Sequence, residues 1–367
     1  MTRKIFKLIA LICIPLGSFA QEKSTTMIFG KVSQEYRNNI LRLRDSTKID
    51  DYRTNLYFSL ENKRKLFKKS RLDLFYELRH HRYDEFQKFS RHDHLGNLKF
   101  QQSMTEKIHF HVSNELRARF SSTEDFSYIR NIANIYLNIA INPQNRAYIG
   151  IQNWSKDYFD ASDYQQYKSS RYYAKLNIQM TKSANLGLHT EYNKHEGNLY
   201  PGSRAADLNL ELDGHRYIFI SRLDKIFNRN LFATFAYRFE NDFPAEIENE
   251  QTGQRINDES YDDLLAEDSD FGYIKNQFSL SSLVKLTPRF SLLLFYNIYN
   301  KEFKFWPIRP DGPKRDDQLL FLSHTFKVKL GSKFTFELQH IYEDNDTNLR
   351  LFTYQMNTIA AGISAQF

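Results

Sequence analysis

Apolar and polar residues alternate along most of the chain from Arg71 onward. Leu72 and Leu74 share one parity, whereas Asp73 and Glu77 share the other. A period of two places successive side chains on opposite faces of a β-strand. The alternation predicts strands near 71–79, 97–104, 107–120, 129–141, 146–155, 170–181, 185–194, 207–223, 230–241, 273–286, 290–302, 318–330, 333–343 and 350–367.

The connections between these strands are alternately short and long. Tight links of turn-forming residues lie near 105–107, 142–145, 181–185, 224–230, 287–289 and 331–333, and long polar stretches lie near 80–97, 121–128, 155–169, 194–206, 241–272 and 301–317. Bacterial outer-membrane barrels have short periplasmic turns and long external loops, whereas a soluble sandwich has no reason to sort its connections. The sequence therefore predicts an all-β transmembrane antiparallel β-barrel of about fourteen strands, with twelve or sixteen as open alternatives.

One predicted strand has an irregular pattern. The parity of its apolar residues shifts near Asp213 and Gly214. An extra residue on one strand of a pair produces such a shift, so we expect a β-bulge there.

The last residues alternate with particular regularity. Ile359, Ile363 and Phe367 share one parity, and the smaller Thr358 and Ser364 share the other. This stretch resembles the closing strand of bacterial outer-membrane β-barrels. The resemblance implies that Phe367 is an assembly signal, read by the outer-membrane insertion machinery at the periplasmic edge.

The first twenty residues have the three regions of a secretory signal peptide. They are a basic start with Arg3, an apolar run from Ile5 to Leu16, and a small-residue cleavage site near Ala20. The single cysteine, Cys13, follows Ile12 rather than the small residue that a lipoprotein anchor needs. We expect residues 1–20 to be removed, 21–51 to form a periplasmic lead-in or plug with a short helix near 33–45, and 52–367 to form the barrel.

Composition is compatible with this location without deciding it. The mean hydropathy of −0.62 would suit a soluble protein, but barrels evade such a scan because only alternate residues face lipid. The net charge of +7 is too small to indicate nucleic-acid binding. The expected location is the outer membrane of a Gram-negative bacterium, with outer-membrane lipid and lipopolysaccharide as partners and the oligomeric state left open.

The inward positions of the predicted strands are rich in cations. A water-filled lumen with this lining would favour anionic solutes through its positive potential. Alternatively, the charges pair across strands and fill a closed interior. The residues expected to line the lumen and set its selectivity are Arg71, Arg79, Lys107, Arg117, Arg119, Lys175, Arg238, Lys327 and Lys329.

A second candidate site combines a base with a nucleophile. His111 and Ser113 lie two residues apart, and the run to Asn114 resembles the His-x-Ser-Asn element of outer-membrane phospholipases and lipid A deacylases. That resemblance would imply acyl hydrolysis on lipid. The alternation turns both side chains inward, however, and Glu115 stands where a glycine is common, so two polar lumen residues are the alternative.

The remaining motifs add little chemistry. The acidic stretch 241–272 could hold divalent cations, although a solvated loop explains it equally well. We find no phosphate-binding loop, no dinucleotide fingerprint and no His/Cys metal cluster, and we expect no cofactor. The resulting hypothesis is a porin-like channel for small hydrophilic, and by its lining anionic, solutes. The alternatives are an accessory barrel that binds a protein partner and a lipid acyl hydrolase.

Overall fold

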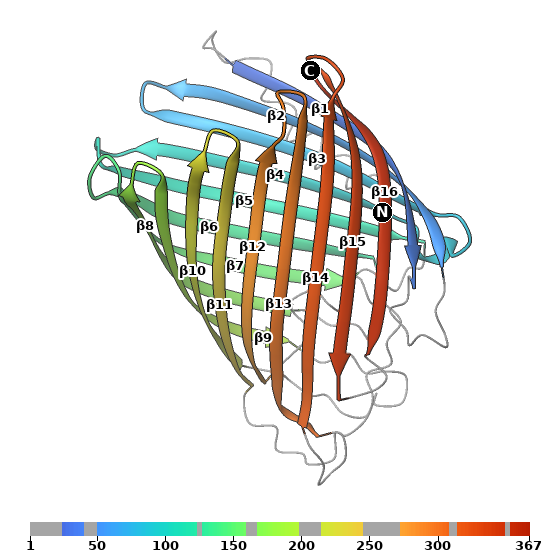
Figure 1. The fold of residues 1–367 in the computed structure, drawn as a ribbon. Coiled ribbons are helices and arrows are strands. Elements are labelled where there is room, and N and C mark those ends of the chain that lie inside the picture. Colours follow the sequence, from blue (N-terminus) through green and yellow to red (C-terminus); the bar gives the residue numbers. More distant parts are fainter. Residues whose placement is uncertain are drawn as a thin grey trace.

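The computed structural model describes residues 24–39, 50–122, 127–158, 167–197, 214–244, 272–307, 314–348 and 353–367. Its strands are β1 (Ser24–Asn38), β2 (Asp51–Phe67), β3 (Ser70–Tyr83), β4 (Arg91–Ser103), β5 (Ile108–Ser121), β6 (Tyr128–Ala140), β7 (Arg146–Tyr158), β8 (Tyr167–Thr181), β9 (Ala184–Gly197), β10 (Gly214–Asn228), β11 (Leu231–Pro244), β12 (Tyr273–Lys285), β13 (Phe290–Pro307), β14 (Lys314–Lys329), β15 (Phe334–Thr347) and β16 (Tyr354–Gln366). Each strand pairs antiparallel with its neighbours in the chain, and β16 pairs with β1, so the sheet closes into a barrel (Figure 1). A 3₁₀ turn, η3 (Gln87–Phe89), lies between β3 and β4. No helix among the described residues is long and apolar enough to cross a membrane.

The barrel has sixteen strands rather than about fourteen, and both additional strands lie at the amino-terminal side. The expected lead-in or plug over 21–51 instead contributes β1, which pairs with both β16 and β2. The helix expected near 33–45 is absent from its described part, which is β-strand as far as Asn38. On β1 the outward Ile28 and Val32 alternate with Gly30 and Gln34, so the apolar pattern that marks the later strands is broken. The expected signal peptide lies outside the described residues.

The connections confirm the predicted asymmetry. Seven of them are turns of two to five residues, and the other eight span six to twenty-eight residues. Figure 1 places the short turns at the upper edge of the barrel, where the C-terminus also lies. By the rule for outer-membrane barrels, this edge is periplasmic and the opposite edge is extracellular. Several strands run further toward the extracellular edge than predicted, because β3 extends through Tyr83 and β4 begins at Arg91.

The β-bulge expected near Asp213 falls at the border of the described residues, and the described part of β10 has an irregularity of its own. The register between β10 and β11 shifts between Ile226 and Asn228, beside the periplasmic turn. Gly214 is the first residue of β10, and residue 213 lies outside the described part of the chain. The described part of the strand predicted over 207–223 runs from Gly214 and continues further, to Asn228.

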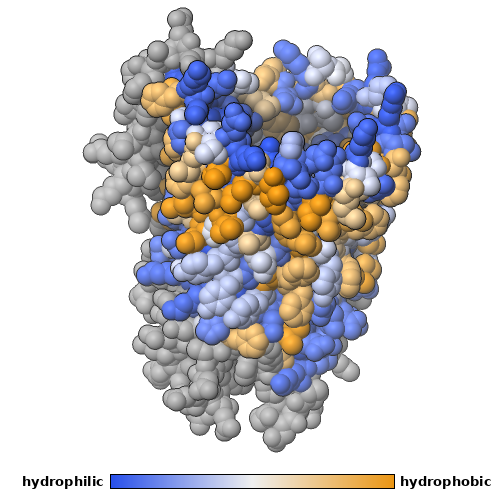
Figure 2. All heavy atoms as spheres, turned by 90° about the vertical axis from the view of Figure 1, so that its left-hand side faces the viewer, coloured by the Kyte–Doolittle hydropathy of each residue, from blue (hydrophilic) through white to orange (hydrophobic). Residues whose placement is uncertain are grey.

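The outer surface carries an apolar belt. Figure 2 shows hydrophobic residues forming a band across one face of the barrel, with more hydrophilic residues above and below it. Three outward tyrosines, Tyr172, Tyr192 and Tyr217, lie side by side with ring centroids 6.2 and 5.2 Å apart. Aromatic girdles of this kind mark the membrane interface of transmembrane barrels.

Candidate functional site

The inner wall is polar because each strand turns its hydrophilic parity inward. On β16 the outward Ile359 and Ile363 are 53% and 46% exposed, whereas the inward Thr358 is 1% exposed. This is the orientation predicted for the closing strand. A solute that crosses the barrel would therefore meet the polar side chains of the inner wall.

Several wall carboxylates are shared between two basic groups. Asp93 lies 2.6 Å from Arg119 and 3.8 Å from Arg91. Glu240 lies 2.6 Å from Arg238 and 3.6 Å from Lys275. Because one carboxylate cancels one charge, a carboxylate shared by two Lys or Arg side chains leaves a positive excess on the wall, whereas His189 beside Glu191 adds a charge only when it is protonated. The other shared carboxylates are Glu35 with Arg37 and Arg53, Glu191 with Arg171 and His189, and Glu337 with Lys31 and Lys327.

The expected lumen cations fall into three groups. Arg119 and Lys327 contact carboxylates on a neighbouring strand, Asp93 at 2.6 Å and Glu337 at 2.6 Å. Arg71, Arg79 and Arg238 pair within their own strand, with Asp73 at 2.6 Å, Glu77 at 2.5 Å and Glu240 at 2.6 Å. Lys107 is a correction, because it lies exposed in the turn between β4 and β5 and not on the wall. The turn begins where β4 ends, and alternation no longer applies there.

The third group consists of cations that form no salt bridge among the described residues. No salt bridge is found for Arg117, Lys175 or Lys329 in the described part of the wall. Lys175 instead lies 4.9 Å from the ring centroid of Tyr173. Three further inward cations also lack a salt bridge among the described residues. They are Lys99, Arg146 and Lys285.

Inward side chains in the middle of the barrel remain accessible. The side chain of Arg222 is 55% exposed and that of Arg79 is 44% exposed, although each pairs with a carboxylate two residues away. Inward Phe295 is 38% exposed and contacts Phe321 with ring centroids 5.8 Å apart. Since barrels of sixteen or more strands are wide enough to leave an aqueous channel, these exposures indicate that wall side chains alone do not fill the interior.

A row of aromatic residues crosses the inner wall, and sequence analysis did not single it out. His111 stacks on Tyr136 with ring centroids 4.4 Å apart, and both face inward. Next along the row, Tyr173 lies over Gly150 and donates a hydrogen bond to Asn134 Oδ1 at 3.0 Å. The sequence pattern could have indicated this row, because Tyr136 and Tyr173 stand at inward positions where other strands have charged residues.

His111 and Ser113 do not form a catalytic pair in the described structure. His111 is 4% exposed, and neither of its ring nitrogens has a hydrogen-bond partner. A serine nucleophile requires a base within hydrogen-bond reach. The described residues also contain no group of three or more His, Cys, Asp or Glu side chains arranged to hold a metal ion. Most of the acidic stretch 241–272 lies outside the described residues.

At the extracellular end of the wall the charged residues are buried. Arg216 is 2% exposed and lies 3.2 Å from Asp242, which is fully buried and also accepts a hydrogen bond from the Gly272 amide at 2.6 Å. Tyr273, 2% exposed, donates to Glu240 at 2.7 Å. Buried charges need such partners because desolvation is otherwise costly.

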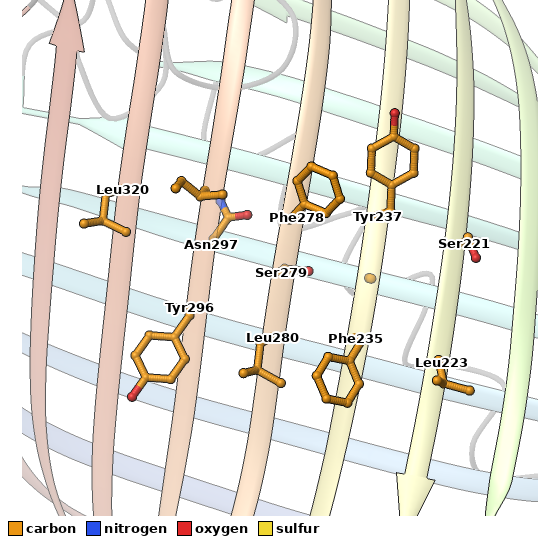
Figure 3. A pocket seen from close by; sticks show the side chains of 12 residues that line it. Ser221, Leu223, Phe235, Tyr237, Phe278, Ser279, Leu280, Tyr296, Asn297 and Leu320 are labelled. Atoms are coloured by element: carbon orange, nitrogen blue, oxygen red, sulfur yellow. The ribbon is translucent and has the colours of Figure 1, made fainter.

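The outer surface has a depression of about 520 Å³ over β10 to β14. Figure 3 shows Phe235, Phe278 and Tyr296 around it, with Ser279 between the larger side chains. Phe235 and Phe278 are outward residues of the apolar belt, 44% and 58% exposed. The depression therefore faces lipid and is separate from the lumen.

No protein-family model and no curated protein matches the sequence. Solved structures do match over nearly the whole length. OccK2 (OpdF) of Pseudomonas aeruginosa, in complex with glucuronate, has a TM-score of 0.55 at 9% identity, covering 95% of this chain and 99% of that one. OpdL of the same species has a TM-score of 0.53 at 8% identity, covering 94% and 99%. OmpT of Vibrio cholerae has a TM-score of 0.52 at 10% identity, covering 95% and 100%.

The chain has the fold of a porin-like outer-membrane β-barrel. The porin-like fold accounts for the apolar belt, the polar inner wall and the sorted connections. It also corrects the strand count, since closure requires β1 to pair with β16. At identities near 10% the match concerns the fold, so the roles of wall residues depend on the geometry of this barrel.

Proposed function

We propose that the barrel is a passive channel for small hydrophilic solutes and that it prefers anions. The proposal is carried by the excess of cations on the inner wall, where carboxylates such as Glu240 and Glu337 are shared between two basic groups. Positive potential inside a low-dielectric wall raises the local concentration of anions. The wall cations expected from the sequence, apart from Lys107, would contribute to this field.

The preference would operate along the length of the lumen. Lys329 and Lys285 near the periplasmic end have no salt-bridge partner in the described structure, so their charges are available to a passing solute. Accessible aromatic and apolar side chains such as Phe295 provide surface for the non-charged part of a solute. Small organic anions fit such a mixed lining better than simple sugars do. The glucuronate complex of OccK2 concerns a protein of the same fold and is compatible with this proposal.

Planar-bilayer electrophysiology tests the proposal. With a salt gradient across the membrane, the reversal potential of the wild type should indicate that anions permeate better than cations. Reversing Lys327 and Lys329 (Lys327→Glu, Lys329→Glu) should shift the potential toward cation selectivity, because both charges lie on the inner face of β14.

Lys168→Glu with Arg82→Glu is the matched control. It makes the same total charge change at outward, exposed positions near the extracellular edge, and the selectivity should stay that of the wild type. A folded wild type without conductance would refute the channel. Conductance with equal shifts in both double variants would refute selection by the lumen lining.

A further inference from the structure

Each of the seven short periplasmic turns carries an exposed apolar residue followed within five positions by an exposed cation. Phe67, directly before Lys68, is 71% exposed, and Met180, two residues before Lys182, is 59% exposed. Nothing in barrel closure demands this repetition. The seven pairs are Phe67–Lys68, Met104–Lys107, Ile141–Arg146, Met180–Lys182, Phe227–Arg229, Leu286–Arg289 and Leu330–Lys333, and we call them the turn collar.

The cations of the turn collar form no ion pairs with the described part of the fold, although Lys333 Nζ lies 5.0 Å from the ring centroid of Phe367. None of the seven is in a salt bridge within the described residues, and Glu106 is the only carboxylate in these turns. The turns are held instead by their own polar side chains. Thr287 Oγ1 accepts from the Arg289 amide at 3.2 Å, and Asn142 Oδ1 accepts from the Asn145 amide at 2.8 Å.

The opposite edge of the barrel has a different charge. Beside the longer connections, the described ends of the strands carry exposed carboxylates, including Asp84, Glu85 and Asp346. Exposed cations such as Arg82 and Lys168 also lie at this edge, but there they stand among carboxylates, whereas the seven short turns contain only Glu106. In Figure 2 hydrophilic residues border the apolar band along the upper edge, the edge of the short turns.

We propose that the turn collar binds the phosphate groups of acidic phospholipids in the periplasmic leaflet. An apolar side chain at the edge of the belt enters the hydrocarbon, and a cation beside it reaches the headgroup level. The apolar partner decides the occupant, because a soluble acidic protein on these turns would leave Phe67 and Met180 exposed to water. The inference is independent of transport, since six of the seven cations lie in the turns between strands; Arg146, the first residue of β7, is the one with an inward parity.

Lipid competition in reconstituted bilayers tests the proposal. The full barrel is placed in phosphatidylcholine bilayers with trace spin-labelled phosphatidylglycerol or phosphatidylcholine, and the motionally restricted fraction gives the relative affinity. The wild type should prefer phosphatidylglycerol, and salt should weaken the preference. One cation at an anionic bilayer surface contributes about fivefold to the affinity for an acidic lipid. The measured preference is an affinity per lipid, so neutralising the collar should reduce it about fivefold, toward one.

Two variants keep the test decisive. Lys182→Gln, Arg229→Gln and Arg289→Gln neutralise three neighbouring turns and should lower the preference partly, even if the variant with all seven substitutions does not assemble. Arg82→Gln with Lys168→Gln, at the extracellular edge, should leave it unchanged. A wild type that does not prefer phosphatidylglycerol would overturn the proposal, and so would a preference that survives neutralisation. The proposal would also be overturned if the turns bound a soluble acidic protein and neutralising them left the lipid preference unchanged.

Discussion

The extracellular and periplasmic halves of the inner wall differ in whether their charged side chains are buried and paired. Toward the extracellular edge, Asp242 and Arg216 are 0% and 2% exposed and contact each other. Toward the periplasmic edge, Lys285 and Lys329 are exposed and have no salt bridge in the described structure. A buried charge must be paired, whereas a hydrated charge need not be. Buried, paired charges hold the extracellular half together, whereas hydrated charges in the periplasmic half are the ones that the proposed anion preference would use.

The largest effect is expected at the periplasmic edge itself. The amide and carbonyl of Phe367 exchange hydrogen bonds of 2.8 and 2.9 Å with Ile28 on β1, and its ring packs against Phe334. Phe367→Asp would place a charge at the lipid-facing seam where the barrel closes, so assembly should fail, and any barrels that do assemble should keep the selectivity of the wild type. Heat-modifiable migration of outer-membrane fractions measures assembly, and normal levels of folded variant would contradict this role for Phe367.

The next largest effect is expected in the buried extracellular half. Asp242→Ala removes the buried carboxylate that lies 3.2 Å from Arg216, which should lower the free energy of unfolding by about 3 kcal/mol. Urea unfolding in lipid vesicles measures the change. The matched change in the exposed half, Asp73→Ala beside Arg71, should cost less than about 1 kcal/mol. Equal losses would remove the distinction between the halves.

An intermediate effect is expected at the aromatic row between the halves. A Cβ at Gly150 would lie 2.6 Å from Tyr136 Cβ and 2.6 Å from the Tyr173 ring, so Gly150→Ala should destabilise the barrel by about 1–3 kcal/mol. Gly96→Ala is the control, because nothing lies within 4 Å of the added Cβ. The same unfolding assay compares them, and a neutral Gly150→Ala would show that the Tyr173 ring is free to move.

The smallest effect on stability is expected for the unpaired cations. Lys285→Gln and Lys175→Gln remove charges that form no salt bridge, so the free energy of unfolding should change by less than about 0.5 kcal/mol. Anion preference in bilayers should nevertheless decrease. Loss of stability without any change in selectivity would reverse the proposed division of roles.

The alternation predicted fourteen of the sixteen strands, because on those strands lipid selects apolar residues at every second position. The two strands that were not predicted, β1 and β2, have an interrupted apolar pattern. Gly30 and Gln34 interrupt the outward parity of β1, and Asn62 and Arg64 interrupt that of β2. β1 is held in the barrel by pairing with β16, and β2 by pairing with β3. The pattern of residues within one strand does not predict such pairing.

The predicted wall cations were mostly placed on the correct face, but their partners were beyond prediction. Lys31 and Lys327 meet at Glu337, although Lys31 is separated from it by 306 residues. Lys107 failed as a wall residue because alternation ends at the turn. The row of His111, Tyr136 and Tyr173 was also missed, since only the register of four strands brings it together.

Sequence by itself determined which face of each regular strand meets lipid and which connections are short, because both depend on residues close together in the chain. Only the tertiary structure decided how many strands close the barrel, which charges are buried in pairs and which remain free. Those outcomes depend on the register between strands and on closure by β1 and β16, whose residues lie at opposite ends of the sequence. The physical reason is that solvation acts on each residue locally, whereas the pairing of charges requires a specific neighbour.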